Sequence, residues 1–111
     1  MNLQKRTPYR NKAILKSAEG EDCTMESPWC NHNPETVVFC HLNYQWAGKG
    51  GRQKADDHAG FYGCSNCHDW YDGRPIKSDR MIIEKDLDKQ FYAFRAITRT
   101  WRRLLDKGVL K

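Results

Sequence analysis

The spacing of the cysteines constrains this chain more than any other feature of its sequence. Cys64 and Cys67 have two residues between them, which is the spacing of a metal-binding knuckle. Cys23 and Cys30 lie upstream, with six residues between them, and complete a set of four thiols. Because structural zinc sites are tetrahedral and closed, we expect these four cysteines to bind one structural Zn²⁺ ion.

Disulfide bonds are the alternative use for cysteines in a chain of 111 residues. The odd total of five cysteines, the short spacing and the lack of a secretory signal pattern argue against a disulfide framework. No segment approaches the ~20 consecutive apolar residues of a membrane span, so no membrane association is expected. We therefore expect a cytosolic protein of one domain, in which a bound metal supplements a small hydrophobic core.

The net charge of +5 is unevenly distributed along the sequence. Residues 1–18 contain five basic residues and no acid, and residues 92–111 contain six basic residues against Asp106 alone. The middle, residues 19–91, has 8 basic and 13 acidic residues. The basic ends are suited to a polyanion such as nucleic acid, although they are equally consistent with solvated faces, and the middle has carboxylates available for cations.

Local patterns indicate short elements around the cysteines. Asn11 is placed to cap a short helix over residues 11–18. The β-branched and aromatic segment Thr36–Leu42 is the best candidate for a strand. A second short helix is expected over His68–Asp72, so His68 would stand at the start of that helix.

A long C-terminal helix is predicted to begin at Ser78 or Asp79 and to run to about Asp106. Its apolar residues recur at helical spacing and are expected to form its buried face. These residues are Leu87, Phe91, Phe94, Ile97, Trp101, Leu104 and Leu105. Residues 1–10 are expected to be a flexible basic segment, and residues 11–111 a single domain.

Two basic segments are candidates for contacts with phosphate. Arg95, Arg99 and Arg102 share one face of the last helix, which is either a phosphate-binding face or a solvated one. Lys49 and Arg52 lie in a glycine-rich loop, whose backbone can approach phosphate closely. The loop lacks the spacing of a nucleotide-binding P-loop, and a mobile linker is an equally good interpretation.

His41 and His68 are the candidate catalytic residues. One zinc ion bound by both cysteine pairs would bring the strand after the first pair near the helix after the second pair. Two neighbouring histidines suit metal-assisted hydrolysis of a phosphodiester, with one imidazole as general base and the other holding a divalent cation. The alternatives are that His41 is a hydrogen-bonded residue at a strand end, and that His68 is a zinc ligand or a helix-start residue.

These segments resemble the HNH, or ββα-metal, endonucleases. The resemblance rests on the strand Val38–Leu42, which contains His41, and on the string Cys64-X-X-Cys67-His68. The small lambdoid prophage nucleases of the YbcO-like group are more similar still. They resemble the strings Cys30-Asn-His-Asn-Pro-Glu-Thr36 and Cys64-Ser-X-Cys-His-Asp-Trp-X-Asp-Gly73, and the resemblance covers roughly residues 11 to 110.

The resemblance implies an α+β fold of the ββα-metal (HNH, treble-clef-like) type, stabilised by zinc and followed by a long C-terminal helix. It implies a phage or prophage nuclease that hydrolyses phosphodiester bonds in DNA in the cytoplasm of a bacterial host. His41 matches the general base, and His68 matches the final metal-binding histidine. Asp57 is the candidate oxygen ligand for a catalytic Mg²⁺ or Mn²⁺ ion, and the four cysteines match the structural zinc ligands.

Two non-catalytic functions are also compatible with these features. One is a zinc-stabilised module that binds nucleic acid through its basic ends, and the other is an adaptor for another phage or host protein. All three functions need the zinc-stabilised fold, but only the nuclease needs His41 and His68 near a common site. The relative position of these two histidines therefore distinguishes the nuclease from the other two functions.

Overall fold

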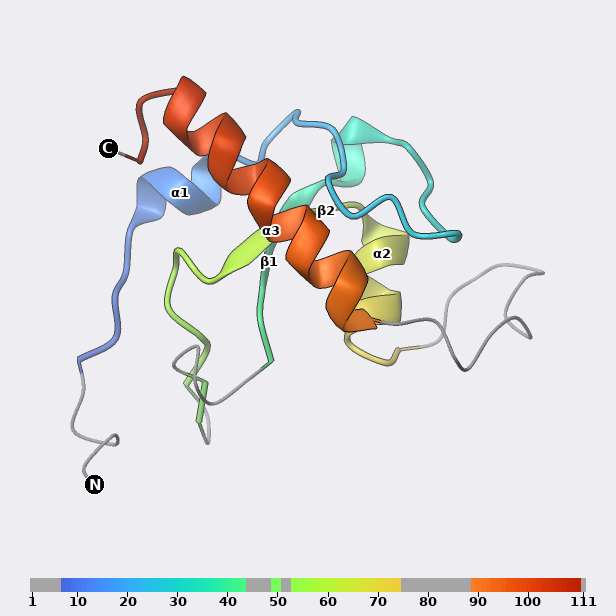
Figure 1. Ribbon diagram of the computed structural model, residues 1–111, viewed down its shortest axis with the longest axis horizontal. Coiled ribbons are helices and arrows are strands. Elements are labelled where there is room, and N and C mark those ends of the chain that lie inside the picture. Colours follow the sequence, from blue (N-terminus) through green and yellow to red (C-terminus); the bar gives the residue numbers. More distant parts are fainter. Residues whose placement is uncertain (1–6, 44–48, 51–52, 75–88, 111) are drawn as a thin grey trace.

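A computed structural model of the chain describes residues 7–43, 49–50, 53–74 and 89–110. In chain order, its elements are α1 (Lys12–Lys16), the short 3-10 helix η2 (Pro34–Thr36), β1 (Val38–His41), β2 (Gly60–Gly63), α2 (Ser65–Tyr71) and α3 (Lys89–Asp106). Figure 1 shows α3 running across the two-stranded sheet, with α1 near one end of α3 and α2 near the other. The chain is therefore a small α+β protein with a long C-terminal helix.

The sheet is a single antiparallel pair in which His41 lies opposite Gly60. The predicted strand is confirmed in its central part, which is β1. β2 was not predicted as a strand from the sequence. Its two large residues, Phe61 and Tyr62, lie between glycines, and this run is too short for an alternating pattern to be recognised.

Gly60 has no room for a side chain. A Cβ atom there would come within 2.3 Å of the Cys40 carbonyl oxygen and 2.6 Å of the Phe39 ring. We expect Gly60→Ala to lower the free energy of unfolding by about 1–3 kcal/mol, because β1 has to shift to admit the methyl group. Urea denaturation measures this loss. Gly50→Ala is the control, since a Cβ there meets no atom within 4 Å, and equal losses in both variants would contradict the steric explanation.

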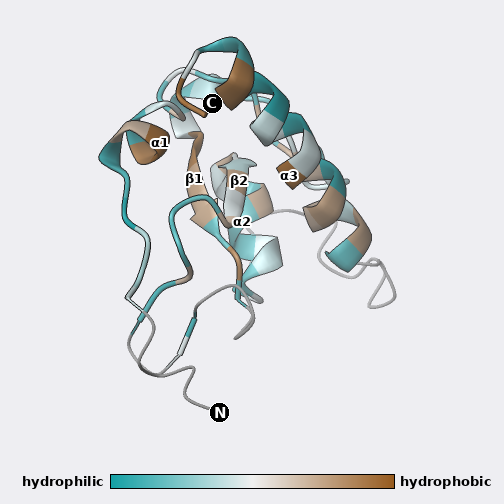
Figure 2. Ribbon diagram, turned by 60° about the vertical axis from the view of Figure 1, so that its left-hand side comes forward, coloured by the Kyte–Doolittle hydropathy of each residue, from teal (hydrophilic) through white to brown (hydrophobic). Residues whose placement is uncertain are grey.

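α3 packs on the sheet through small side chains. The buried residues of α3 are Ala93, Ala96, Thr100 and Leu104. Four residues predicted to be buried are instead 43–74% exposed, and the prediction is wrong for them: Phe91, Phe94, Trp101 and Leu105. Small residues let the helix approach the strand backbone closely, and this turns the large residues outward. Figure 2 shows hydrophobic and hydrophilic residues interleaved along α3.

Of the remaining predicted core positions in the last helix, Leu104 is fully buried and Ile97 is partly buried. Leu87 lies outside the described residues, as do the predicted helix starts at Ser78 and Asp79. Among the helices that the structure describes, none combines the length and the apolar character needed to cross a bilayer.

Thr100 connects α3 to β2 and to the cysteine loop, which is the loop between Cys23 and Cys30. Its hydroxyl oxygen accepts a hydrogen bond from the Tyr62 backbone N–H at 3.0 Å and lies 3.0 Å from the Thr24 hydroxyl. The Thr24 backbone N–H donates to the Tyr62 carbonyl oxygen at 2.9 Å. These contacts occupy both backbone groups of Tyr62, on the edge of β2 that faces away from β1.

α1 is shorter than the predicted helix and is capped as predicted. The Asn11 side-chain oxygen accepts a hydrogen bond from the Ala13 backbone N–H at 3.0 Å. Ile14 is fully buried, which anchors this short helix to the core.

Candidate functional site

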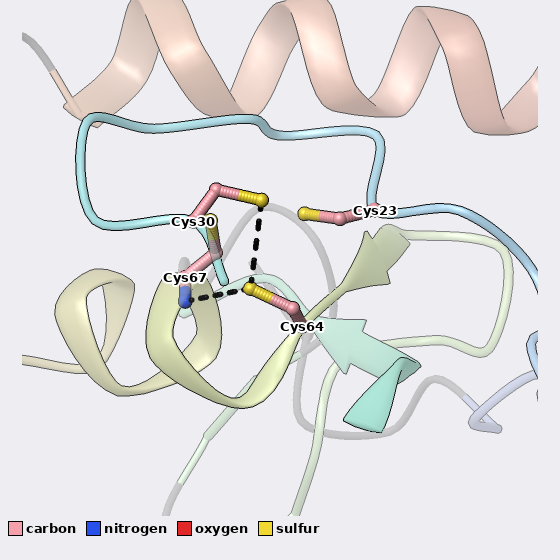
Figure 3. A group of neighbouring side chains, drawn as sticks. All are labelled: Cys23, Cys30, Cys64 and Cys67. Carbon is pink, nitrogen blue, oxygen red and sulfur yellow. Dashed lines mark hydrogen bonds between the residues drawn. The ribbon is translucent and has the colours of Figure 1, made fainter. Parts of the chain in front are cut away.

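The four cysteines of the predicted zinc set converge at one place in the fold (Figure 3). Cys23 and Cys30 come from the segment between α1 and β1, and Cys64 and Cys67 come from the N-terminal end of α2. Their four sulfur atoms all lie within 4.8 Å of one another. The predicted convergence of the two pairs is confirmed, and the set could hold a metal ion such as zinc.

The sulfur positions fit a tetrahedral thiolate site. Metal–sulfur bonds of ~2.3 Å place any two sulfur atoms of a tetrahedron about 3.8 Å apart. The sulfur atoms of Cys30 and Cys64 are 3.8 Å apart. All five cysteines are free of disulfide bonds, so the alternative disulfide framework is not formed. Four soft thiolate ligands favour zinc over hard cations such as Mg²⁺.

The close approach of the four thiols alters their acidity. Hydrogen bonds from the Cys23 and Cys67 thiols hold the pKa of Cys64 well below its usual range. Burial raises the pKa of the Cys30 thiol to about 12, and hydrogen bonding with Cys23 and Cys64 raises the pKa of Cys67. A metal ion therefore has to displace protons from the cluster, and the affinity for metal falls as the pH is lowered.

Cys64 also starts α2. Its sulfur accepts the Cys67 backbone N–H at 3.4 Å and serves as the N-cap of the helix. α2 therefore begins at Ser65, and the prediction that His68 stands at the helix start is wrong, because His68 lies one turn further in. The Ser27 hydroxyl lies 3.1 Å from the Cys67 sulfur. This hydrogen bond orients the Cys67 side chain toward the other three cysteines.

His41 is held by a buried carboxylate. Its Nε2 lies 2.9 Å from Oδ1 of Asp57, whose side chain is 2% exposed, while the imidazole is 15% exposed. Oδ2 of Asp57 accepts the Asn11 backbone N–H at 2.7 Å. The guanidinium of Arg10 lies 3.5 Å from Oδ1, and the Asp57 backbone N–H donates to the Tyr9 carbonyl at 2.9 Å. Tyr9 and Arg10 are thus part of this site, although the sequence assigned them to the flexible basic segment of residues 1–10.

Asp57 is suited to orient His41. Burial alone raises the pKa of its carboxyl group, but hydrogen bonds from His41 and Asn11 and the charges of His41 and Arg10 bring that pKa below its ordinary value. In the neutral form of His41, a carboxylate that accepts Nε2–H places the single ring proton on Nε2, and Nδ1 can then act as a base. The sequence suggested Asp57 as a metal ligand, whereas its described contacts are those of a residue that positions the imidazole.

His68 faces a different carboxylate, one helical turn away. Its Nε2 lies 3.1 Å from Oδ2 of Asp72, and the other oxygen of Asp72 accepts a hydrogen bond from the Asn43 side chain at 2.8 Å. A nitrogen and an oxygen about 3 Å apart match neighbouring positions around an octahedral cation with bonds of 2.0–2.1 Å. Sequence reasoning did not name Asp72, although its spacing of four residues from His68 places both on one helix face.

Arg74 also binds this carboxylate. One of its guanidinium nitrogens lies 2.9 Å from Oδ2 of Asp72, and another lies 3.1 Å from Oδ1 of Asp69. A divalent cation at His68 and Asp72 would therefore have to displace the Arg74 guanidinium from the shared oxygen. Within the part of the chain that the structure describes, the cysteine cluster alone brings three or more possible ligand atoms close enough together for one ion.

His41 and His68 lie on different faces of the hairpin. His41 shares its face with Phe39, and the two rings are 5.3 Å apart between centroids. Phe61 points to the opposite face, where its ring meets Tyr71 of α2 edge-on at 5.4 Å. α2 therefore covers the face opposite His41, which differs from the expectation that both histidines lie on one side.

The segment after β1 nevertheless connects the two histidines. Asn43, two residues after His41, donates its backbone N–H to the Tyr71 hydroxyl at 3.4 Å and its side-chain N–H to Asp72. Both imidazoles thus flank the end of the hairpin at which β1 leaves the sheet.

Two of the predicted phosphate-binding arginines connect α3 to the cysteine loop. Arg95 donates to the Met25 carbonyl oxygen at 2.8 Å. Arg99 lies 2.6 Å from a carboxylate oxygen of Glu26. These contacts stabilise the loop between the first two cysteines, a role that their helical spacing did not indicate.

The other predicted basic residues are placed differently. The side chain of Arg102 is 74% exposed and pairs with Asp106 one turn along α3 at 2.7 Å. Lys49 is half-buried, and Arg52 lies outside the described residues. Arg102 is therefore the most accessible of the three predicted arginines on α3.

Comparison with known proteins gives one consistent family. The model of the family described as "Putative nuclease YbcO" matches residues 12–109. The YbcO proteins of Escherichia coli (strain K12) and of Enterobacteria phage 82 are each 32% identical to this chain over 100 residues, which covers 88% of this chain and 96% of the relative. A solved structure of a bacteriophage protein from Escherichia coli str. K-12 substr. MG1655 is 29% identical, with a TM-score of 0.61, and the match covers 86% of this chain and 99% of that one.

Proposed function

Because the chain belongs to the YbcO family, whose description is "Putative nuclease YbcO", we propose that it hydrolyses phosphodiester bonds in DNA with a bound divalent cation. The observation that carries this proposal is the imidazole of His41, held at 2.9 Å by the buried carboxylate of Asp57. An oriented imidazole with one free nitrogen and partial access to solvent is suited to act as a general base. The order strand, strand, helix, with His41 on β1 and His68 on α2, supports an HNH type of nuclease.

In the proposed reaction, Nδ1 of His41 takes a proton from the attacking water. Asp57 keeps the imidazole in its orientation and stabilises the imidazolium that forms. The new oxygen–phosphorus bond forms in line with the bond that breaks, and the leaving oxygen takes a proton from solvent. When bound, a Mg²⁺ or Mn²⁺ ion would neutralise charge on the scissile phosphate.

We assign the cation to His68 and Asp72, and we assign Asp57 to the positioning of His41. The four cysteines would hold a separate structural zinc ion, which has all four of its positions filled by protein and none open to substrate. The phosphate contacts in this proposal are Arg95, Arg99, Arg102, Lys49 and Arg52. Such contacts position the nucleic acid and carry no sequence information by themselves.

Changes at the proposed cation site are expected to alter the metal dependence of cutting. In a plasmid-nicking assay with zinc-loaded protein, His68→Ala or Asp72→Ala should raise the Mn²⁺ concentration for half-maximal cutting about tenfold or more, because a ligand is lost. Arg74→Ala should lower that concentration, because it removes the guanidinium that competes for Asp72. A titration of Mn²⁺ for each variant measures both shifts.

The outcomes of this assay separate the candidate functions. Cutting by the wild type that does not depend on added divalent ions would contradict the assignment of the cation. Binding of DNA without cutting under any divalent ion would replace the nuclease with a non-catalytic nucleic-acid-binding module. The absence of both binding and cutting would favour an adaptor protein.

A further inference from the structure

An open pocket lined by aromatic rings lies beside the residues that hold His41. Its volume is about 500 Å³, and its walls are Tyr9, His58, Trp101 and Leu110. Tyr9 and Trp101 are each 43% exposed, so part of each ring is open to a ligand. The pocket is built from three distant parts of the chain: the segment before α1, the segment before β2, and the C-terminal half of α3 with the residues that follow it.

Two polar groups of the pocket rings form hydrogen bonds within the chain. Nε1 of Trp101 donates to the His58 carbonyl oxygen at 3.1 Å, and the Tyr9 hydroxyl accepts a hydrogen bond from the Asn11 side chain at 2.9 Å. The rings of Tyr9 and His58 meet at 71°, with their centroids 5.6 Å apart. The pocket therefore offers ring faces and an aliphatic side chain to a ligand, which suits a flat aromatic group.

The pocket is joined to Asp57 and His41 by a peptide bond and by a backbone hydrogen bond. His58 directly follows Asp57, the residue that holds His41. Tyr9 accepts the Asp57 backbone N–H on its carbonyl oxygen at 2.9 Å. Two of the four pocket residues are thus immediate neighbours of the residue that orients the proposed base. The pocket and the proposed base are therefore connected through Asp57.

We propose that the pocket binds an unpaired base of a single-stranded nucleic acid next to the site of cleavage. This inference rests on the proposed nuclease function and names its substrate class, a strand whose bases are free to leave the stack. Aromatic side chains bind bases by stacking, whatever the base, because every base has a π-face. Since stacking does not depend on the hydrogen bonds to base edges that carry sequence information, the pocket selects for an unpaired base.

The affinity of zinc-loaded protein for a fluorescein-labelled oligothymidylate tests the pocket, with His41→Ala as the parent so that the strand is not cut. Adding Trp101→Ala or Tyr9→Ala should weaken binding about 5- to 150-fold, the effect of one lost base stack. Trp101→Phe keeps a ring and should keep most of the affinity. Phe94→Ala is the matched control, because Phe94 is a 74% exposed aromatic on α3 outside the pocket, and its loss should leave the affinity unchanged.

A sugar–phosphate strand of the same length without bases separates stacking from phosphate attraction. The parent should prefer the strand with bases, and Trp101→Ala should abolish that preference. The proposal is overturned if Trp101→Ala and Tyr9→Ala bind the oligothymidylate as tightly as the parent does. It is equally overturned if both variants still prefer the strand with bases over the strand without them. It is also overturned if Trp101→Ala lowers the molecular mass measured by light scattering, since a second copy of the chain would then fill the pocket. Wild-type protein that shows the preference but never cuts would reject the nuclease and leave the base pocket standing.

Discussion

Removal of metal from the four-cysteine cluster is expected to unfold the protein. A structural zinc ion contributes an apparent ~10–16 kcal/mol in zinc-finger peptides at neutral pH, and a domain of this size has a net stability of about 5–15 kcal/mol. The cluster joins the segment between α1 and β1 to the start of α2, so removal of the metal would leave four closely spaced thiols without the ion that links these two parts. A zinc chelator at neutral pH should therefore abolish the helical circular dichroism signal, and added zinc should restore it. Lowering the pH should have the same effect, because protons compete for the thiolates.

Cysteine variants test the same expectation site by site. Cys67→Ser should lower the zinc content and leave the protein unfolded or strongly destabilised. Cys40→Ala is the matched control, because Cys40 is the fifth cysteine, fully buried in β1 and outside the cluster. The control should keep one zinc per chain and lose only the smaller stability of a reduced side chain in the core. A Cys67→Ser protein that keeps both its fold and its zinc would contradict the role of the cluster.

His41→Ala is expected to reduce DNA cleavage by about 10²–10⁴-fold, the usual contribution of a general base. Binding of DNA should be retained, because the imidazole is 15% exposed and faces Asp57. The change removes no zinc ligand, so the zinc content and circular dichroism should match those of the wild type. Added imidazole should restore part of the activity by replacing the lost base. Unchanged cleavage by His41→Ala would contradict the assignment of the base.

Asp57→Asn tests the positioning of the imidazole. The amide is neutral and can present an N–H group to His41, so the ring loses the charge that stabilises the imidazolium, and we expect cleavage to fall while substrate affinity holds. Asp56→Asn is the matched control. The neighbouring carboxylate oxygen of Asp56 accepts the Tyr9 backbone N–H at 3.1 Å, and an amide oxygen can accept the same bond. Equal losses of activity in both variants would point to a general disturbance of this segment.

The cysteines and α1 could be read from the sequence because short-range rules determine them. The two-residue spacing of Cys64 and Cys67 matches the geometry of a metal knuckle, and the second pair follows from the need for four ligands. Asn11 caps α1 through its own side chain, two residues from the N–H that it binds. The knuckle spacing and the cap both lie within a few residues, and the requirement for four ligands links the two cysteine pairs without knowledge of the tertiary arrangement.

The buried face of α3 and the hydrogen-bond partners of His41 and His68 could not be predicted from local sequence patterns. Helical periodicity favoured Phe94 and Trp101 as core residues, whereas close packing on β2 selected Ala96 and Thr100. Hydrophobic periodicity assumes that the largest side chains are buried, and it fails where a helix must approach a strand closely. The pairing of His41 with Asp57 depends on how the loop between β1 and β2 returns, which no local pattern encodes.

The hydrogen bonds of Thr100 and Thr24 to Tyr62 also bear on solubility. A sheet of two strands has two open edges, and an open edge is a template for pairing with strands of other molecules. On the outer edge of β2, the N–H and C=O of Tyr62 are both occupied by threonine partners from other segments. A strand from a second chain would have to break buried hydrogen bonds before it could add there. Through Thr100, α3 thereby hinders the addition of a foreign strand at the outer edge of β2, as well as completing the core.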